Sequence, residues 1–174
     1  MSSDQELYDE IDKNDLPTGR KITRQQAHSQ KLIHCVVAVF VFAADGRLYI
    51  QERKGEGIYD HSVGGHVDSG EDYQTAAYRE TAEELGLEGV HLSVVELSIL
   101  SDGRDFSHMH GLFTCQAPPD WTFVPNDEVE HIFLWTIEEL VEHINTDATH
   151  FTRGFINTTK AYIRHRNLPY KITV

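Results

Sequence analysis

The sequence has few cysteines and no long apolar run. Its two cysteines, Cys35 and Cys115, both lie in apolar segments, so we expect buried free thiols rather than a disulfide. No stretch approaches the roughly 18 consecutive apolar residues of a membrane-spanning helix, and the first residues lack the pattern of a secretion signal. We therefore expect a cytoplasmic protein that does not insert into a membrane.

Basic residues are also scarce relative to acidic ones. The chain has 15 Lys and Arg against 28 Asp and Glu, which gives a formal net charge of -13. This charge repels nucleic-acid backbones and anionic lipid surfaces, and no Lys/Arg cluster relieves it locally. Nucleic acids and membranes are therefore not expected as partners, and an anionic small molecule would need cations at its binding site. The chain has 11 histidines, more than a protein of this size usually carries.

The length allows one core. The 174 residues, 40% of them apolar, are enough for a single domain and short for two. We predict an N-terminal arm or hairpin (1–31), a core (32–166) and a tail (167–174). The run 33–42 is too continuously apolar for a strand with one wet face, so it predicts a central strand covered on both faces.

The remaining elements follow from local composition and turn residues. Strands and helices alternate, which predicts an α/β sandwich with a mixed sheet. Further strands are expected at 47–53, 90–100, 110–116 and 129–135, and helices at 72–85, 137–144 and 153–166.

The helix expected at 72–85 gathers negative charge on one face. At ~100° per residue, Glu80, Glu83 and Glu84 share one sector. Like charges at these spacings repel each other, and a hard divalent cation such as Mg²⁺ would reverse the effect. The alternative is a solvated helix face with an ion pair between Arg79 and Glu83. The opposite sector, expected to pack, holds Tyr78, Thr81, Ala82 and Leu85.

The segment 65–87 resembles the Nudix box. The box has a glycine, five residues, a glutamate, seven residues and an Arg-Glu pair. After this pair come an apolar position, any residue, a Glu-Glu pair, any residue, a glycine and an apolar residue. The fixed positions match Gly65, Glu71, Arg79, Glu80, Glu83, Glu84, Gly86 and Leu87, and the soft departure is Thr81. The resemblance implies a Nudix-type α/β/α sandwich with a mixed β-sheet and an enzyme that hydrolyses a diphosphate linkage.

The same resemblance implies roles for individual residues. Glu80 and Glu84 would bind Mg²⁺ or Mn²⁺ directly, and Glu83 would be a further ligand or the base that activates water. Glu71 would support the metal site or ligate the metal, and Arg79 would orient the carboxylates. Three residues outside these positions complete the expected site: Gly64 through its carbonyl, Glu128 as a contact to metal or substrate, and Arg53 as a phosphate-binding residue. The alternative for Glu128 is an exposed loop carboxylate.

Within the family, the chain looks most like the branch of type I isopentenyl diphosphate isomerase. The similarity lies in Arg24, His28 and His34, in Arg53 at the end of 51–53, and in the stretch 62–66. Two departures argue against isomerase chemistry. Gly64 stands where the isomerases have a catalytic cysteine, and His108-Met109-His110 stands where they have a Glu-x-Glu strand.

The isomerase resemblance also implies a second metal site made of histidines. It would comprise His28, His34, His66 and His110, with His108 as the alternative fourth ligand, and would suit Zn²⁺ or a similar ion. The competing interpretation is packing, in which His34 begins a core strand, His66 hydrogen-bonds in the glycine loop and only one of His108 and His110 points inward.

Three functions are therefore compared. The leading hypothesis is a metal-dependent hydrolase of a nucleoside diphosphate derivative or a similar X-linked diphosphate. The alternatives are an isomerase of prenyl diphosphates and a non-catalytic metabolite-binding domain. The expected partner is a small-molecule diphosphate, and a homodimer is an open option.

Overall fold

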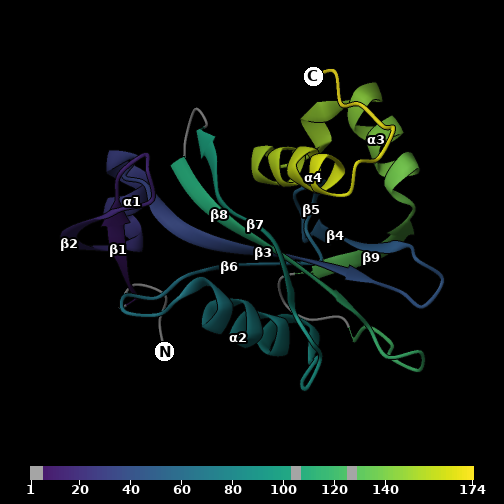
Figure 1. Ribbon diagram of the computed structural model, residues 1–174, viewed down its shortest axis with the longest axis horizontal. Coiled ribbons are helices and arrows are strands. Elements are labelled where there is room, and N and C mark those ends of the chain that lie inside the picture. The colour runs from purple at the N-terminus through teal and green to yellow at the C-terminus, as the bar shows by residue number, and fades with distance from the viewer. Residues whose placement is uncertain (1–5, 103–106, 125–128) are drawn as a thin grey trace.

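The computed structural model describes residues 6–102, 107–124 and 129–174, arranged in three layers. A mixed sheet lies in the middle (Figure 1). Helix α2 (Tyr73–Leu85) covers one face, and helices α3 (Ile137–Thr146) and α4 (Arg153–His165) cover the other. The predicted α/β/α sandwich with a mixed sheet is confirmed.

Strand β3 (His34–Phe42) is the central strand. It pairs antiparallel with β6 (Val63–His66) and parallel with β8 (Ser107–Gln116). Its side chains alternate between the two faces, so Val39 packs in the core with α2 whereas Phe40 packs in the core with α3 and α4. The prediction of a strand covered on both faces is confirmed, and the pairing places β6 and β8 directly beside it.

The outer strands extend the sheet on both sides. Strand β4 (Leu48–Arg53) pairs antiparallel with β5 (Ile58–Asp60) and with β9 (Val129–Trp135). Strand β7 (Ser93–Asp102) pairs antiparallel with β8. The strands expected near 47–53 and 129–135 are confirmed, whereas the short strands β5 and β6 were not predicted.

The N-terminal residues form a hairpin followed by a short helix. Strands β1 (Leu7–Ile11) and β2 (Pro17–Thr23) pair with each other, and β1 also pairs with β3. Helix α1 (Arg24–Gln30) begins with a capping box, in which Thr23 and Gln26 each bond the other's backbone N–H. The sequence predicted an arm or hairpin here but not α1, which carries His28. Buried side chains join these elements into a small core: Tyr8, Ile22 and Ala27.

The C-terminal residues return to the core. After α4, Leu168 and Tyr170 pack against the core beneath α3 and α4, and Ile172 is buried in it. The predicted tail therefore contributes apolar contacts to the α4 side of the sandwich.

Both cysteines are free thiols, as predicted. Cys115 is buried, and Cys35 is half-buried with its thiol 3.5 Å from a carboxylate oxygen of Asp15. None of the helices in the described part of the chain has the length and apolarity needed to cross a membrane.

Candidate active site and histidine group

Both ends of helix α2 are capped, which defines where the helix begins and ends. The Asp72 side chain accepts a 2.7 Å hydrogen bond from the backbone N–H of Thr75. At the other end Gly86 takes a left-handed conformation, with φ of 62°, and its N–H bonds the carbonyl of Ala82 at 3.0 Å. Glycine adopts this conformation without the cost that a side chain would add.

One face of α2 packs and the other is acidic, with one difference from expectation. Thr81 is buried at the position where the Nudix box has an apolar residue, and its hydroxyl donates a 2.6 Å hydrogen bond to the carbonyl of Ala77, so the polar group is satisfied. Tyr78 was expected on the packing face but is 37% exposed. It lies at the edge of that face, where its hydroxyl oxygen accepts a bond from the N–H of Leu92.

Arg79 holds the carboxylates of the acidic face together. Its Nε and Nη2 donate to the two carboxylate oxygens of Glu71 at 3.1 and 2.8 Å, a bidentate geometry. Its Nη1 donates to Glu80 at 2.7 Å and to Glu83 at 3.4 Å. Its Nη2 also donates to the carbonyl oxygen of His66 at 2.9 Å. The ion pair with Glu83 is therefore one contact in a network that spans three glutamates and a strand.

The surroundings shift the pKa values of Glu71 and Glu80 in opposite directions. Burial disfavours the ionised form of Glu71, but the hydrogen bonds from Arg79 and from the N–H of Asp68 outweigh it and lower the pKa of this carboxyl. At Glu80, burial dominates over Arg79 and raises the pKa. A bound cation beside Glu80 would favour its ionised form, as the metal-ligand role requires.

Two residues, one on β4 and one on β6, contact the acidic face. Gln51 of β4 donates from Nε2 to Glu84 at 2.9 Å and also bonds the backbone carbonyl of Ser62. Gly65 of β6 lies so close to Glu80 that a Cβ at this position would overlap the Glu80 carboxylate. The acidic face thus contacts bare backbone at Gly65, and Gly64 is the next residue on the same strand.

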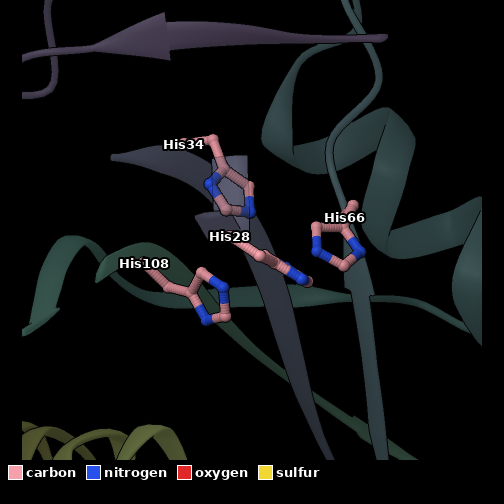
Figure 2. Close-up of side chains that lie close together, drawn as sticks. All are labelled: His28, His34, His66 and His108. Atoms are coloured by element: carbon pink, nitrogen blue, oxygen red, sulfur yellow. The ribbon is translucent and has the colours of Figure 1, made fainter. Parts of the chain in front are cut away.

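Four histidines from four elements form a second cluster, the histidine group. Figure 2 shows their rings pointing toward one another, and one ligand nitrogen from each lies within 4.8 Å of all the others. Pairing of β3 with β8 sets His34 opposite His108, and pairing with β6 sets Val36 opposite His66. The members are His28 of α1, His34 of β3, His66 of β6 and His108 of β8.

The histidine group has the chemistry that a metal ion needs. The Nδ1 of His34 lies 3.0 Å from the carbonyl oxygen of Leu32, which only accepts, so Nδ1 carries the proton and Nε2 presents a lone pair. Among the described residues, the buried Nε2 atoms of His34 and His66 have no hydrogen-bond partner. Burial lowers the pKa of His66 to about 2 and that of His108 to about 3, which keeps both in the neutral, ligating form. A soft or borderline cation such as Zn²⁺ fits this donor set.

The fourth member corrects the sequence prediction. His110 was expected in the group, but the structure places His108 there, because His108 lies directly opposite His34 in the parallel pairing. The alternative view that only one of the two points inward is also wrong, since residues two apart on a strand share a face. His110 is 4% exposed, and its ring centroid lies 6.0 Å from that of His108 and 5.9 Å from that of His61.

A cavity of about 630 Å³ lies beside the histidine group. Three members of the group line it, and so do Gly64 and Gly65 of β6. Three guanidinium-bearing residues also line it: Arg24, Arg53 and Arg153. Two carboxylate-bearing residues, Glu56 and Asp60, line it as well, so the cavity wall carries three guanidinium groups and two carboxylates.

Arg53 lies in the cavity wall, where the sequence suggested a phosphate-binding residue, but part of its fork is engaged. Its Nη2 and Nε donate to one carboxylate oxygen of Asp60 at 2.6 and 2.9 Å. Burial opposes ionisation of Asp60, yet His61 and Arg53 together lower its pKa well below the ordinary range. The Nη1 of Arg53 is 4.0 Å from a carboxylate oxygen of Glu56.

The last predicted site residue, Glu128, lies outside the described residues. It precedes β9, which pairs with β4 and so runs beside the strand that carries Gln51 and Arg53. Its role stays a prediction.

Comparison with known proteins identifies the fold and the box. The NUDIX domain model matches residues 32–156, which include α2, both glycines and all but one of the histidine group. The chain belongs to the Nudix family. This membership supports a pyrophosphohydrolase role and leaves the substrate undetermined.

Similar proteins within the family are named either as Nudix hydrolases or as isopentenyl-diphosphate isomerases. The chain is 32% identical over 157 residues to an uncharacterised Nudix hydrolase of Nostoc sp., covering 83% of this chain and 89% of the relative. It is 28% identical over 165 residues to an isopentenyl-diphosphate Delta-isomerase of Serratia proteamaculans, covering 86% and 87%. Both lines of similarity agree with the isomerase-like Nudix branch suggested by the sequence.

A solved structure supports the fold independently. The crystal structure of DR0079 from Deinococcus radiodurans superposes with a TM-score of 0.72 at 23% identity, covering 89% of this chain and 97% of that one. At this identity the similarity supports the fold and carries no argument on substrate.

Proposed function

We propose that this Nudix protein is a metal-dependent hydrolase that cleaves a diphosphate linkage in a small molecule, such as a nucleoside diphosphate derivative or another X-linked diphosphate. The observation that carries this proposal is the Arg79 network, which links Glu71, in the loop before α2, to Glu80 and Glu83 on the face of α2 that meets bare backbone at Gly65. A merely solvated helix face would not need a glycine beneath one of its carboxylates.

In this proposal each residue of the site has a distinct role. Glu80 and Glu84 would hold Mg²⁺ or Mn²⁺, with Glu71 and the Gly64 carbonyl completing the site. A bound Mg²⁺ would neutralise phosphate charge and acidify water. Glu83, which is 61% exposed, would accept the proton of the attacking water as the P–O bond to the leaving phosphate breaks. Arg79 fixes the carboxylates before substrate arrives, so little reorganisation is needed.

The wider cavity supports an anionic substrate. Arg24, Arg53 and Arg153 line the same cavity as Gly64 and Gly65, so a diphosphate in this cavity would lie near three guanidinium groups. The histidine group would hold a second ion of the Zn²⁺ type in the wall of this cavity. Its four imidazoles come from separate elements, so that ion would also tie α1 to the sheet.

A substrate panel tests the proposal. Mg²⁺-dependent release of phosphate or of a monophosphate is measured over nucleoside diphosphate derivatives, sugar and alkyl diphosphates, and isopentenyl diphosphate. We expect hydrolysis of at least one class, abolished by chelation. Formation of dimethylallyl diphosphate would instead support the isomerase. Tight binding of a panel member without turnover would support the non-catalytic alternative.

A further inference from the structure

A buried histidine outside the histidine group has hydrogen-bonding capacity that the protein does not use. His110 of β8 lines the cavity and is 4% exposed, and neither Nδ1 nor Nε2 has a hydrogen-bond partner among the described residues. The neighbouring imidazole differs, because His61 bonds Asp60 through Nδ1 at 2.7 Å and Thr158 through Nε2 at 2.8 Å. Of these two histidines, only His110 has ring nitrogens available to bind a ligand.

The backbone around His110 is shaped to keep its ring in place. Gly154, in the first turn of α4, approaches so closely that a Cβ there would lie 2.7 Å from Cε1 of His110. A side chain at 154 would push the ring out of its position. Gly154 leaves room for the His110 ring in the cavity wall. His61, whose two ring nitrogens already have partners, does not bond it.

An unpaired buried imidazole costs free energy unless the occupant of the cavity bonds it. Neutral imidazole has one N–H donor and one lone-pair acceptor, and a hydroxyl group offers both complements. A hydrocarbon chain offers neither. The same cavity is lined by Arg24, Arg53 and Arg153, so a diphosphate bound by these arginines would place its organic part in the space that His110 lines.

We propose that His110 is a specificity-determining residue that binds a hydroxyl group on the organic part of the substrate, so that the chain selects hydroxylated diphosphates over hydrocarbon ones. This inference rests on the proposed hydrolase function and adds the substrate class to it. A site built to bond a hydroxyl discriminates strongly against the analogue that lacks it, because the protein's polar group is then left buried and unpaired.

Matched pairs of non-hydrolysable probes test this proposal. The probes are methylenediphosphonate analogues of 3-methylbutyl diphosphate and 3-hydroxy-3-methylbutyl diphosphate, with further pairs that carry the hydroxyl at the second or fourth carbon. Binding to the full chain is measured by calorimetry with Mg²⁺ present. For at least one pair we expect the hydroxylated probe to bind about 10-fold tighter or more. In H110L the ratio should fall to about one, and H110Q, which keeps a donor and an acceptor, should restore part of it.

The control variant is H91L, which changes an exposed histidine in the loop before β7 and should keep the wild-type ratio. The wild-type ratio requires no variant, so it tests the proposal even where a variant fails to fold. Equal affinities within every pair, or a preference that persists in H110L, would overturn the role of His110 and leave the hydrolase standing. If no probe binds in the presence of Mg²⁺, the inference fails, and the substrate panel, which includes nucleoside diphosphate derivatives, decides the proposed function separately. If the preference is present but the matching diphosphates are never hydrolysed, only the proposed function fails.

Discussion

The guanidinium of Arg79 donates a 2.9 Å hydrogen bond from Nη2 to the carbonyl oxygen of His66. The same guanidinium binds Glu71 and Glu80 of the acidic face, while the imidazole of His66 points into the histidine group. One side chain therefore contacts the backbone of one candidate metal site and the carboxylates of the other. The two sites are connected through strand β6, and a substitution at Arg79 should affect both sites.

The Arg79 connection predicts a double effect for R79K. Lysine keeps the charge but cannot form the bidentate bond to Glu71 while also bonding His66. We expect hydrolysis to fall by about 10²-fold, in line with loss of a positioning group. Affinity for Co²⁺ at the histidine group should fall by about 10-fold, as when outer-shell partners of metal ligands are changed. R47K, at an exposed pair with Asp45, is the control and should change neither. Loss of activity with unaltered Co²⁺ affinity would show that the two sites are independent.

The glycines of β6 predict opposite outcomes for two similar substitutions. In G65A the new methyl would overlap the Glu80 carboxylate, which is the flexible end of its side chain, so Glu80 should move while the fold survives. We expect activity to fall about 10-fold or more, because small displacements of catalytic groups are costly. In G64A the nearest atom to the methyl is Nδ1 of His61 at 3.7 Å, an ordinary contact, so activity should stay within about two-fold. Initial rates with matched unfolding curves measure both, and equal activities would contradict the assigned position of Glu80.

The membership of the histidine group predicts that His108, and not His110, binds metal. The wild-type chain should bind about one equivalent of Co²⁺ with the visible absorption of a tetrahedral ion. H108Q should weaken this binding by about 10-fold or more, and H110Q should leave it almost unchanged, because His110 lies outside the group. Titration followed by absorption makes the comparison. Loss of the spectrum in H110Q with retention in H108Q would restore the ligand set first expected from the sequence.

Burial of the histidines predicts acid sensitivity of the metal-free protein. Burial lowers the pKa of His66 to about 2 and of His108 to about 3, whereas these side chains titrate near 6.5 in the unfolded chain. Below pH 6.5 the unfolded state binds more protons than the folded state, so the free energy of unfolding decreases as the pH falls from 6.5 toward the folded-state values. In chelator we expect the Tm to be roughly 5 °C lower at pH 5 than at pH 7.5. In H108Q the dependence should be shallower, and a Tm that does not change over this range would refute the neutral, buried state of the group.

Local features of the fold could be predicted because their signals are local. Helix α2 was expected at 72–85 and is found at Tyr73–Leu85, because its Ala and Glu content and the glycine at 86 are local signals of a helix and of its end. Strand β3 was expected to be covered on both faces because its apolar run is uninterrupted. Helix α1 was not predicted, because its seven residues are polar and its single buried position, Ala27, leaves no apolar period to detect.

Non-local features could not be derived in the same way. Strand β6 has two adjacent glycines and little strand propensity, so only its pairing with β3 makes it a strand. The choice of His108 over His110 depends on the register between β3 and β8, which lie far apart in sequence. The bond from Arg79 to His66 and the unused nitrogens of His110 depend on the same long-range packing. Composition and spacing point to the residue types, and the tertiary contacts decide which of them meet.

The most direct test of the hydrolase is the comparison of E84Q with E88Q. Glutamine at 84 keeps the size of the side chain and removes a charge from the proposed metal site, whereas Glu88 is exposed, follows Gly86 and lies outside the box. We expect both variants to fold, with Mg²⁺-dependent kcat lowered about 10²-fold or more in E84Q and nearly unchanged in E88Q. Equal and mild effects of the two substitutions on turnover would contradict a catalytic metal site on this face of α2.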